Sequence, residues 1–238
     1  MNKDNKVWSD KIIKKLDPSF RHRWEVYNDL IYSFLSKNTI WIDIGCGDNS
    51  IVTSFADRSN FAVGIDRKVP EHRTKAAFIC ADLRDLPIKS GIADLVTLRF
   101  VVEHLQNIPD NFKEIDRILK ITGRVIILTT NSWSPFIFLP RLLPFRLKNA
   151  IIQTLYKVSE PETLPTLHKF NSSRKMKCGL GNLKLVSIDF IQDANYVRRW
   201  LFLIFFSWHL LTKRWGLNVF RTCIMAVFQK SIFVLPRK

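Results

Sequence analysis

Short apolar runs that end on glycine or on an acid recur along the first half of the chain. The clearest run is 40–47, Ile-Trp-Ile-Asp-Ile-Gly-Cys-Gly, which is apolar except for Asp43 and closes on Gly45 and Gly47. Runs of this length predict strands that are buried on both faces, as in a parallel sheet. Similar runs predict three more strands, at 63–66, at 77–83 and in a stretch that ends at Arg99.

Apolar residues at helical spacing predict two helices. One covers 21–36, where residues such as Trp24 and Ile31 share a face, and the other covers 111–120 and is stopped by Thr122 and Gly123. After it the pattern predicts three further strands, at 124–130, 184–191 and 220–228.

The ends of the first two runs indicate a cofactor site. Gly45 and Gly47 let the backbone approach a ligand, because no Cβ stands in the way. Asp66 follows them by about twenty residues, the spacing that places a carboxylate on ribose hydroxyls in a doubly wound sheet. Two strand ends are therefore expected to converge on one nucleotide-like ligand.

Four ordered motifs over roughly residues 38–130 resemble those of class I S-adenosylmethionine-dependent methyltransferases. They are D-x-G-x-G after the first strand, Asp66 after the second, Asp82-Leu83 after the third, and the L-P-(apolar)-x-x-G-x-x-D-x-V pattern that starts at Leu86. The resemblance implies an α/β fold, Rossmann-like and doubly wound. Its mostly parallel seven-stranded sheet has an antiparallel last strand and helices on both faces.

The same resemblance implies one methyltransferase domain over 1–238. Its cofactor-binding core would cover about 38–130, acceptor-side and membrane-facing additions about 131–219, and the last strand about 220–230. A chain of 238 residues is long enough to bury a full core as a single unit.

The resemblance also assigns residues to S-adenosylmethionine, the methyl donor, and to its product S-adenosylhomocysteine. The glycine turn would shape the methionine end, Asp66 would bind the ribose, Asp82 and Leu83 would hold the adenine, and Arg99 with Phe100 would line the floor. The full cofactor set is Asp43, Gly45, Cys46, Gly47, Asp66, Arg67, Asp82, Leu83 and Arg99. One position departs from the pattern, because Asn49 stands where many members carry a third glycine. Asparagine tolerates the left-handed region, so we expect an altered loop and intact binding.

The sequence indicates catalytic groups less clearly than cofactor-binding residues. Glu103-His104 resembles a pair that lies near the transferred methyl in this family, and His104 is the leading candidate base. The alternative for His104 is a packing or cofactor-facing role without proton transfer. His168 is a weaker candidate, with a surface loop histidine as the alternative. Neither histidine has metal-ligand spacing, so no metal is expected.

Cysteine usage and the amino terminus point to the cytoplasm. The four cysteines lack C-x-x-C spacing, so neither a zinc site nor a disulfide framework is indicated. No apolar segment of signal-peptide length opens the chain.

Charge separates the two halves of the chain. Residues 1–120 hold 19 Lys or Arg and 17 Asp or Glu, whereas residues 121–238 hold 18 against only 4, a balance of +14. The basic half also contains two apolar stretches, 133–146 and 200–211. The second is too short to cross a bilayer as a helix, which needs about 20 apolar residues.

The two stretches leave three alternatives open. They can lie on an anionic membrane surface, with Phe205, Phe206 and Trp208 facing lipid. They can form a buried lid or dimer core. The positive charge can instead bind nucleic acid, although cations interleaved with aliphatic side chains suit lipid headgroups better than phosphates.

The sequence thus predicts a methyltransferase acting on a small or lipid-linked acceptor. O-methylation at the cytosolic membrane face is the leading hypothesis. The alternatives are an RNA methyltransferase and a catalytically silent cofactor-binding partner protein. The oligomeric state is open.

Overall fold

The strands form one seven-stranded sheet in the computed structural model, which describes residues 3–72, 74–143 and 166–231. The strand order is β3-β2-β1-β4-β5-β7-β6. All neighbours are parallel except β7, which runs antiparallel to both β5 and β6. The strands are β1 (Ile40–Ile44), β2 (Phe61–Asp66), β3 (Ala77–Cys80), β4 (Ala93–Arg99), β5 (Leu119–Thr130), β6 (Leu183–Ile191) and β7 (Cys223–Lys230). The expected Rossmann-like methyltransferase fold is confirmed.

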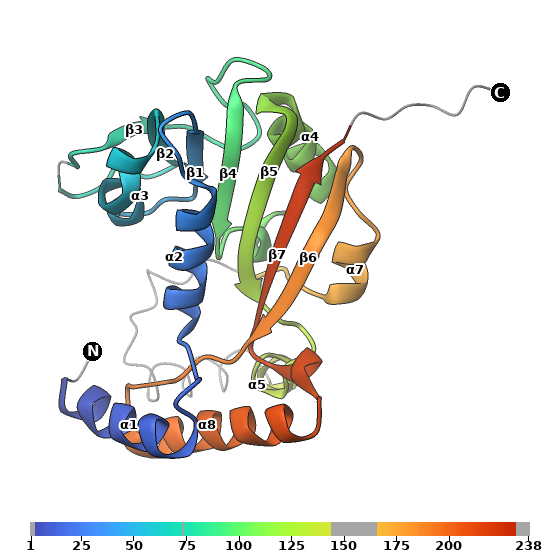
Figure 1. Ribbon diagram of the computed structural model, residues 1–238. Coiled ribbons are helices and arrows are strands. Elements are labelled where there is room, and N and C mark those ends of the chain that lie inside the picture. The colour runs from blue at the N-terminus through green and yellow to red at the C-terminus, as the bar shows by residue number, and fades with distance from the viewer. Residues whose placement is uncertain (1–2, 73, 144–165, 232–238) are drawn as a thin grey trace.

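Helices cover both faces of the sheet and add a separate layer at one end (Figure 1). The longer ones are α1 (Lys3–Leu16), α2 (Arg23–Phe34), α3 (Ser50–Phe55), α4 (Ile108–Ile118) and α8 (Arg199–Arg214). The shorter α-helices are α5 (Pro135–Phe138) and α7 (Ser173–Lys177). Single 3₁₀ turns are η1 (Ala56–Arg58), η2 (Val102–His104), η3 (Leu139–Leu142) and η5 (Asn218–Phe220).

The two predicted helices form where the apolar spacing places them, with ends fixed by local chemistry. His22 caps α2, because its ring accepts a hydrogen bond from the Trp24 N–H while Glu25 accepts one from the His22 N–H. The second helix, α4, begins earlier than predicted, because the Asn107 side chain caps it. It also ends earlier, at Ile118, since Leu119 already pairs with β4.

Two apolar cores occupy the two faces of the sheet. One lies under α4, where Phe112, Ile115 and Ile118 pack on β4 and β5. The other lies under α2, where Tyr27 and Ile31 pack against Trp41 of β1. Trp41 is fully buried, and burying a side chain of this size contributes about 2 to 3 kcal/mol. These cores hold the strands so that the carboxyl ends of β1, β2, β3 and β4 meet at one edge.

A third apolar cluster joins α1 to α8, which lie side by side beyond the carboxyl ends of β4 and β5 (Figure 1). Trp8 of α1 packs edge-on against Phe202, with ring centroids 5.8 Å apart. The turn after α1 is fixed to α8 by Asp17, whose carboxylate lies 2.8 Å from both His209 Nε2 and Lys213 Nζ. These hydrogen bonds hold the pKa of the Asp17 carboxyl below its ordinary range despite burial, which acts in the opposite direction.

The run at 200–211 is therefore helical, but two of the three aromatic residues expected to face lipid do not. Phe205 and Phe206 are 7% and 2% exposed. Phe206 packs against Phe20, and Trp208 is half-buried and donates a hydrogen bond to the Phe220 carbonyl. The expectation for Phe205 and Phe206 was wrong, because the helix turns these positions toward α1 and α5. No described helix is long and apolar enough to span a membrane.

The described part of the second apolar stretch forms only short helical elements. Over 133–143 the stretch forms the short helix α5 and the turn η3, and its remaining residues, 144–146, lie outside the described part of the chain.

Candidate functional site

The glycine turn after β1 is built by hydrogen bonds to β2. The N–H groups of Gly45 and Cys46 donate to the Ile65 carbonyl at 2.7 and 3.2 Å. Gly45 has φ of +71°, and a Cβ at this position would lie 2.2 Å from Val101 Cγ2. Both its conformation and the neighbouring segment after β4 therefore require glycine here.

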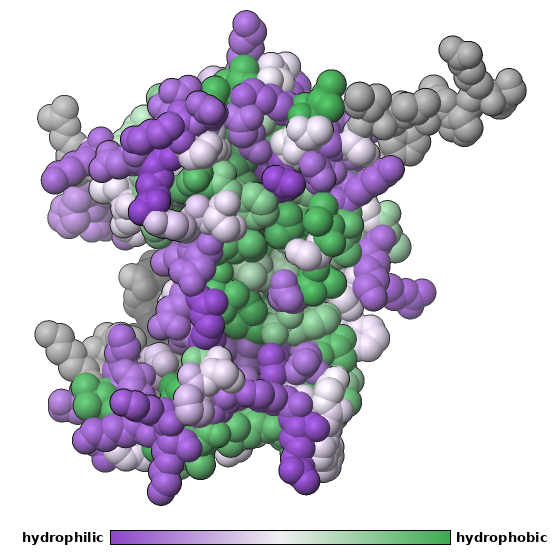
Figure 2. Space-filling view, viewed as in Figure 1, coloured by the Kyte–Doolittle hydropathy of each residue, from purple (hydrophilic) through white to green (hydrophobic). Residues whose placement is uncertain are grey.

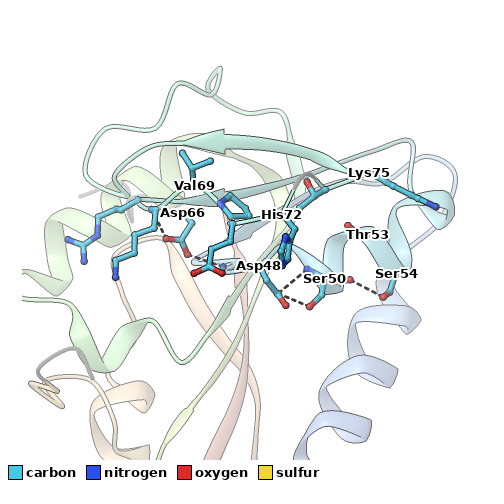
Figure 3. Close-up of a pocket in the computed structure, with 14 residues that line it drawn as sticks. Asp48, Ser50, Thr53, Ser54, Asp66, Val69, His72 and Lys75 are labelled. Atoms are coloured by element: carbon cyan, nitrogen blue, oxygen red, sulfur yellow. Dashed lines mark hydrogen bonds between the residues drawn. The ribbon is translucent and has the colours of Figure 1, made fainter. Parts of the chain in front are cut away.

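Gly47 and Asp66 meet directly at the ends of β1 and β2. The Gly47 N–H donates to the Asp66 carboxylate at 2.9 Å, and the Lys68 N–H donates to the other carboxylate oxygen at 3.0 Å. Gly47 has φ of +59°, and a Cβ on it would meet no described atom within 4 Å. The acid expected to bind ribose thus sits beside an open stretch of backbone (Figure 3).

Asn49 adopts the left-handed conformation expected of it, with φ of 58°. Its buried side chain donates hydrogen bonds to the Thr74 hydroxyl at 3.1 Å and to the Ala77 carbonyl at 3.2 Å. The residue in the third glycine position therefore ties the turn to the segment between β2 and β3. The Asn49 side chain leaves the face of Gly47 open, since a Cβ on Gly47 would meet no described atom within 4 Å.

A cavity of about 1120 Å³ opens beside this turn (Figure 3). One wall consists of Asp48 and the first residues of α3, including Ser50. The other runs from the end of β2 over residues 66–72, with Thr74 and Lys75. Gly47, Asp66 and Arg67 belong to both this cavity and the predicted cofactor set. Asp82, Leu83 and Arg99 lie outside its lining, so the expected adenine and methionine ends lie beyond it.

The predicted adenine residues lie at the end of β3, beside Asp66. Asp82 accepts two hydrogen bonds from the Arg84 guanidinium, both at 3.0 Å, and Arg67 lies 4.0 Å away. The hydrogen bonds from Arg84 hold the pKa of the Asp82 carboxyl below its ordinary value. Leu83 is only 6% exposed and packs into the core, so it offers little of its surface to a ligand.

Asp43 lies inside the protein beneath the turn. It is 2% exposed and accepts a hydrogen bond from the Thr97 hydroxyl, which itself accepts one from the Trp41 indole at 2.9 Å. Burial raises the pKa of the Asp43 carboxyl from 3.8 to about 6, against the effects of Thr97 and Arg99. Asp43 therefore shapes the turn from below rather than presenting its carboxylate at the cavity.

Cations and aromatic rings gather after β4. The Arg99 guanidinium lies 5.3 Å from the Trp24 ring centroid, and Arg23 lies 4.7 Å from the same ring and 5.0 Å from Phe100. Arg23 is paired with Asp193 at 2.9 Å. By contrast, no described carboxylate lies within 4 Å of Arg99, which leaves its charge available to an anionic group.

Glu103 and His104 follow in η2. Glu103 is 2% exposed, and its carboxylate accepts a hydrogen bond from Thr129 at 2.6 Å. Burial raises the pKa of the Glu103 carboxyl. The Glu103 carbonyl accepts hydrogen bonds from the N–H groups of Leu167 and His168, so η2 anchors the segment that carries His168. His104 is partly exposed at the surface of this turn.

His168 is held close to the end of β5. Its Nδ1 lies 3.4 Å from the Thr130 hydroxyl, and its backbone is left-handed with φ of 49°. Left-handed geometry in a non-glycine residue stores strain and occurs often at functional sites. The buried amide of Asn171 links Thr129 and Thr130, so Glu103 and His168 belong to one connected polar network.

These residues fit the cofactor that the motifs imply. S-adenosylmethionine combines a ribose diol, a cationic sulfonium and a free carboxylate. Asp66 beside an uncovered Gly47 suits the diol, and Arg99, which has no carboxylate of the described residues within 4 Å, suits the cofactor carboxylate. No group of three metal-ligating side chains occurs among the residues that the structure describes.

Several of the surrounding groups could not be read from motifs. Trp24 and Arg23 lie on the predicted helix before β1, but only the fold brings them to Phe100. Thr97 and Asn171 give no sequence signal, because their role depends on buried partners far along the chain. The sequence indicated the pairing of Arg84 with Asp82 only weakly, by placing a cation two residues after the acid.

Comparisons with known proteins agree with this geometry. Residues 42–127 match a family described as a methyltransferase domain. An uncharacterised protein of Methanocaldococcus jannaschii is 23% identical over 188 residues, which cover 74% of this chain and 73% of that one.

Two solved structures share the fold. Geranyl diphosphate C-methyltransferase from Streptomyces coelicolor A3(2), in complex with Mg²⁺, geranyl diphosphate and S-adenosyl-L-homocysteine, aligns with a TM-score of 0.54 at 13% identity. The alignment covers 87% of this chain and 77% of that chain. A SAM-dependent methyltransferase from Methanosarcina mazei aligns with a TM-score of 0.54 at 14% identity, over 85% of this chain and 97% of that one.

Proposed function

We propose that this protein, whose residues 42–127 match a methyltransferase domain, is a class I S-adenosylmethionine-dependent methyltransferase that methylates an oxygen atom of a small or lipid-linked acceptor. The observation that carries the proposal is the meeting of Gly47 and Asp66 at adjoining strand ends beside an open cavity. When bound there, S-adenosylmethionine supplies an electrophilic methyl group.

The residues around the strand ends divide the work of binding. Asp66 accepts hydrogen bonds from the ribose hydroxyls, and Asp82 accepts one from the adenine amine. Cys46 and Arg67 lie beside these two acids. Arg99 pairs with the cofactor carboxylate, since a guanidinium forms a strong charge-assisted pair with that group. Holding donor and acceptor in line supplies much of the rate enhancement in such a transfer.

His104 removes the proton of the acceptor hydroxyl in this proposal. Glu103 is turned away, toward Thr129, so its role is to position η2 and not to touch the acceptor. A base is required only when the acceptor proton must leave, which suits O-methylation.

The acceptor is reached at the cytosolic face of a membrane. Two features support this part of the proposal: the balance of +14 in residues 121–238 and the apolar elements α5 and α8 within the same half. A protein with such an excess of positive charge is attracted to anionic surfaces. An acceptor with a lipid tail would then be concentrated where the protein sits.

Labelled methyl transfer tests the proposal. The purified protein is incubated with S-adenosyl-[methyl-³H]methionine and either a lipid extract or total RNA, and Asp66→Ala serves as the control. We expect label in base-labile lipid material, as from a methyl ester, or in an ether product, and none with Asp66→Ala. Label in RNA alone would establish the RNA methyltransferase alternative. Cofactor binding without transfer to any extract would favour the silent partner protein.

A further inference from the structure

Helix α8 is apolar on two opposite faces. Its inner face, which includes Phe202 and Phe206, packs on α1 and on the turn that follows it. Its outer face carries Trp200, Leu203 and Ile204, which are 48%, 45% and 47% exposed. A helix that is hydrophobic all round is normally buried in a core or in lipid, so a solvent-facing apolar row needs a partner.

The outer row continues onto α5 and η3. Phe136 of α5 stacks on Phe205 of α8, with ring centroids 4.3 Å apart. Between the two helices lies a shallow groove of about 470 Å³. Its lining is apolar except for one serine and one indole N–H: Phe136, Leu203, Ile204, Ser207, Trp208 and Leu211.

Beyond the groove, further large apolar side chains stand exposed on the same elements. We call the whole set the outer apolar face, and it consists of Trp133, Phe138, Leu139, Leu142, Trp200, Leu203, Ile204, Leu211 and Trp215. Apolar atoms of α8 show along the lower edge of the molecule in Figure 2, below the hydrophilic surface of α1. Exposed apolar patches of this extent mark interaction sites.

The elements of the outer apolar face carry cations and no carboxylate of their own. Residues 131–143 and 194–231 contain no Asp or Glu. The neighbouring α1 and its following turn supply Asp10 and Asp17, and Asp17 is paired with Lys213. Arg199 opens α8, and Lys213 and Arg214 close it, with Trp200 and Trp215 next to them. Tryptophan and arginine at the borders of an apolar face suit the headgroup level of a bilayer. A protein partner with an apolar surface would not require cations at both ends of α8.

We infer that the outer apolar face docks on an anionic lipid surface, with α8 lying in the plane of the interface. The inference deepens the proposed function and rests on it in one respect, the lipid-linked nature of the acceptor. Because α1 and α8 form the layer beyond the carboxyl ends of β4 and β5, docking through α8 turns the cofactor edge of the sheet toward the membrane (Figure 1). An acceptor anchored in the bilayer then approaches from the side of α5.

Vesicle sedimentation tests the inference without any methyl transfer. Parent protein is spun with vesicles of phosphatidylcholine and phosphatidylglycerol and with vesicles of phosphatidylcholine alone. The docking variant is Leu203→Ser, Ile204→Ser and Leu211→Ser. The matched control is Phe61→Ser, Ile121→Ser and Val186→Ser, three exposed apolar side chains outside the outer apolar face. Thermal unfolding and S-adenosylhomocysteine titration check that each variant is folded and retains its cofactor site.

We expect parent and control to bind the anionic vesicles alike and the docking variant to bind them about 100-fold more weakly. Arg141→Gln with Arg214→Gln should weaken binding by about 30-fold on anionic vesicles, since each cation near the surface contributes about 1 kcal/mol. Cofactor affinity should be the same in all of them, which separates this result from a failure of the proposed function.

Three results would overturn the inference. The first is a folded docking variant that sediments like the parent, and the second is a parent that does not bind anionic vesicles. The third is a parent that runs as a dimer while the docking variant runs as a monomer, with neither binding vesicles. In that case the outer apolar face belongs to a second copy of the chain.

Discussion

Asn49 and Gly64 fit together so closely that a Cβ on residue 64 would lie 2.0 Å from the Asn49 side-chain oxygen. Gly64 sits in β2, paired with Asp43 of β1. Asn49, in the left-handed conformation, points its amide across the strand toward Thr74 and Ala77. The residue that replaces a family glycine is thus accommodated by a glycine elsewhere, and the two positions act as a pair.

Gly64→Ala is expected to destabilise the fold by about 2 kcal/mol or more, because the added methyl overpacks against Asn49 and against Cys46 Sγ at 2.7 Å. Chemical denaturation measures the free energy of unfolding. The control is Gly64→Ala combined with Asn49→Gly, which removes the nearer clash and should recover part of the loss. Equal destabilisation in the single and double variants would show that Asn49 and Gly64 are not coupled.

The buried Asp43 carboxyl gives the stability a defined dependence on pH. Its pKa is raised by burial from 3.8 to about 6, so between these values the folded state binds a proton that the unfolded state has lost. The contribution of this group to stability is present at low pH and falls as pH rises toward about 6. The full difference corresponds to about 3 kcal/mol.

Asp43→Asn removes this titration. The stability of the variant minus that of the parent should therefore increase from pH 4 to pH 7 by up to about 3 kcal/mol. Taking the difference cancels the opposite trend from carboxyls with lowered pKa, such as Asp17 and Asp193. A difference that stays flat with pH would mean that Asp43 is not the titrating group.

His104→Asn should lower turnover by about 100-fold and leave the affinity for S-adenosylhomocysteine unchanged, because a general base acts on the acceptor and not on the cofactor. Glu103→Gln keeps a hydrogen-bond acceptor for the Thr129 hydroxyl, so we expect turnover to fall by less than about tenfold. If His104→Asn weakens cofactor binding instead, His104 is a binding residue.

The sequence predicted the existence and order of the seven strands, for a physical reason. Strands buried on both faces must be continuously apolar, and their carboxyl ends carry the polar residues that meet a ligand, so 40–47 and Asp66 were legible as a unit. Some bounds differ: the run at 77–83 is a strand only to Cys80, the strand expected at 124–130 begins at Leu119, and the one expected at 220–228 covers Cys223–Lys230. Boundaries were less certain where pairing overrides periodicity. Leu119, for instance, was expected in a helix and pairs with Ala93 instead.

The orientation of α8 could not be read from the sequence, because both of its faces are apolar. Periodicity cannot separate Phe205 from Ile204 when nearly every position in the run is apolar and only Ser207 and His209 interrupt it. The packing of α1 decides which face is inner, and α1 is distant in sequence. The cluster of Trp24, Arg23 and Phe100 was hidden for the same reason, since it depends on how α2 crosses the end of β4.

Titration calorimetry of S-adenosylhomocysteine into the parent and into Asp66→Ala tests the central claim most directly. Loss of the carboxylate removes the ribose contacts, and a charge-assisted pair of hydrogen bonds contributes about 2 to 4 kcal/mol. Asp66 also accepts hydrogen bonds from the backbone N–H groups of Gly47 and Lys68, so its loss could disturb the turn. Circular dichroism and thermal unfolding must therefore show that the variant is folded. We predict binding by the parent and at least about 30-fold weaker binding by folded Asp66→Ala. Equal affinity for S-adenosylhomocysteine in the two proteins would contradict the assignment of Asp66 to the cofactor site.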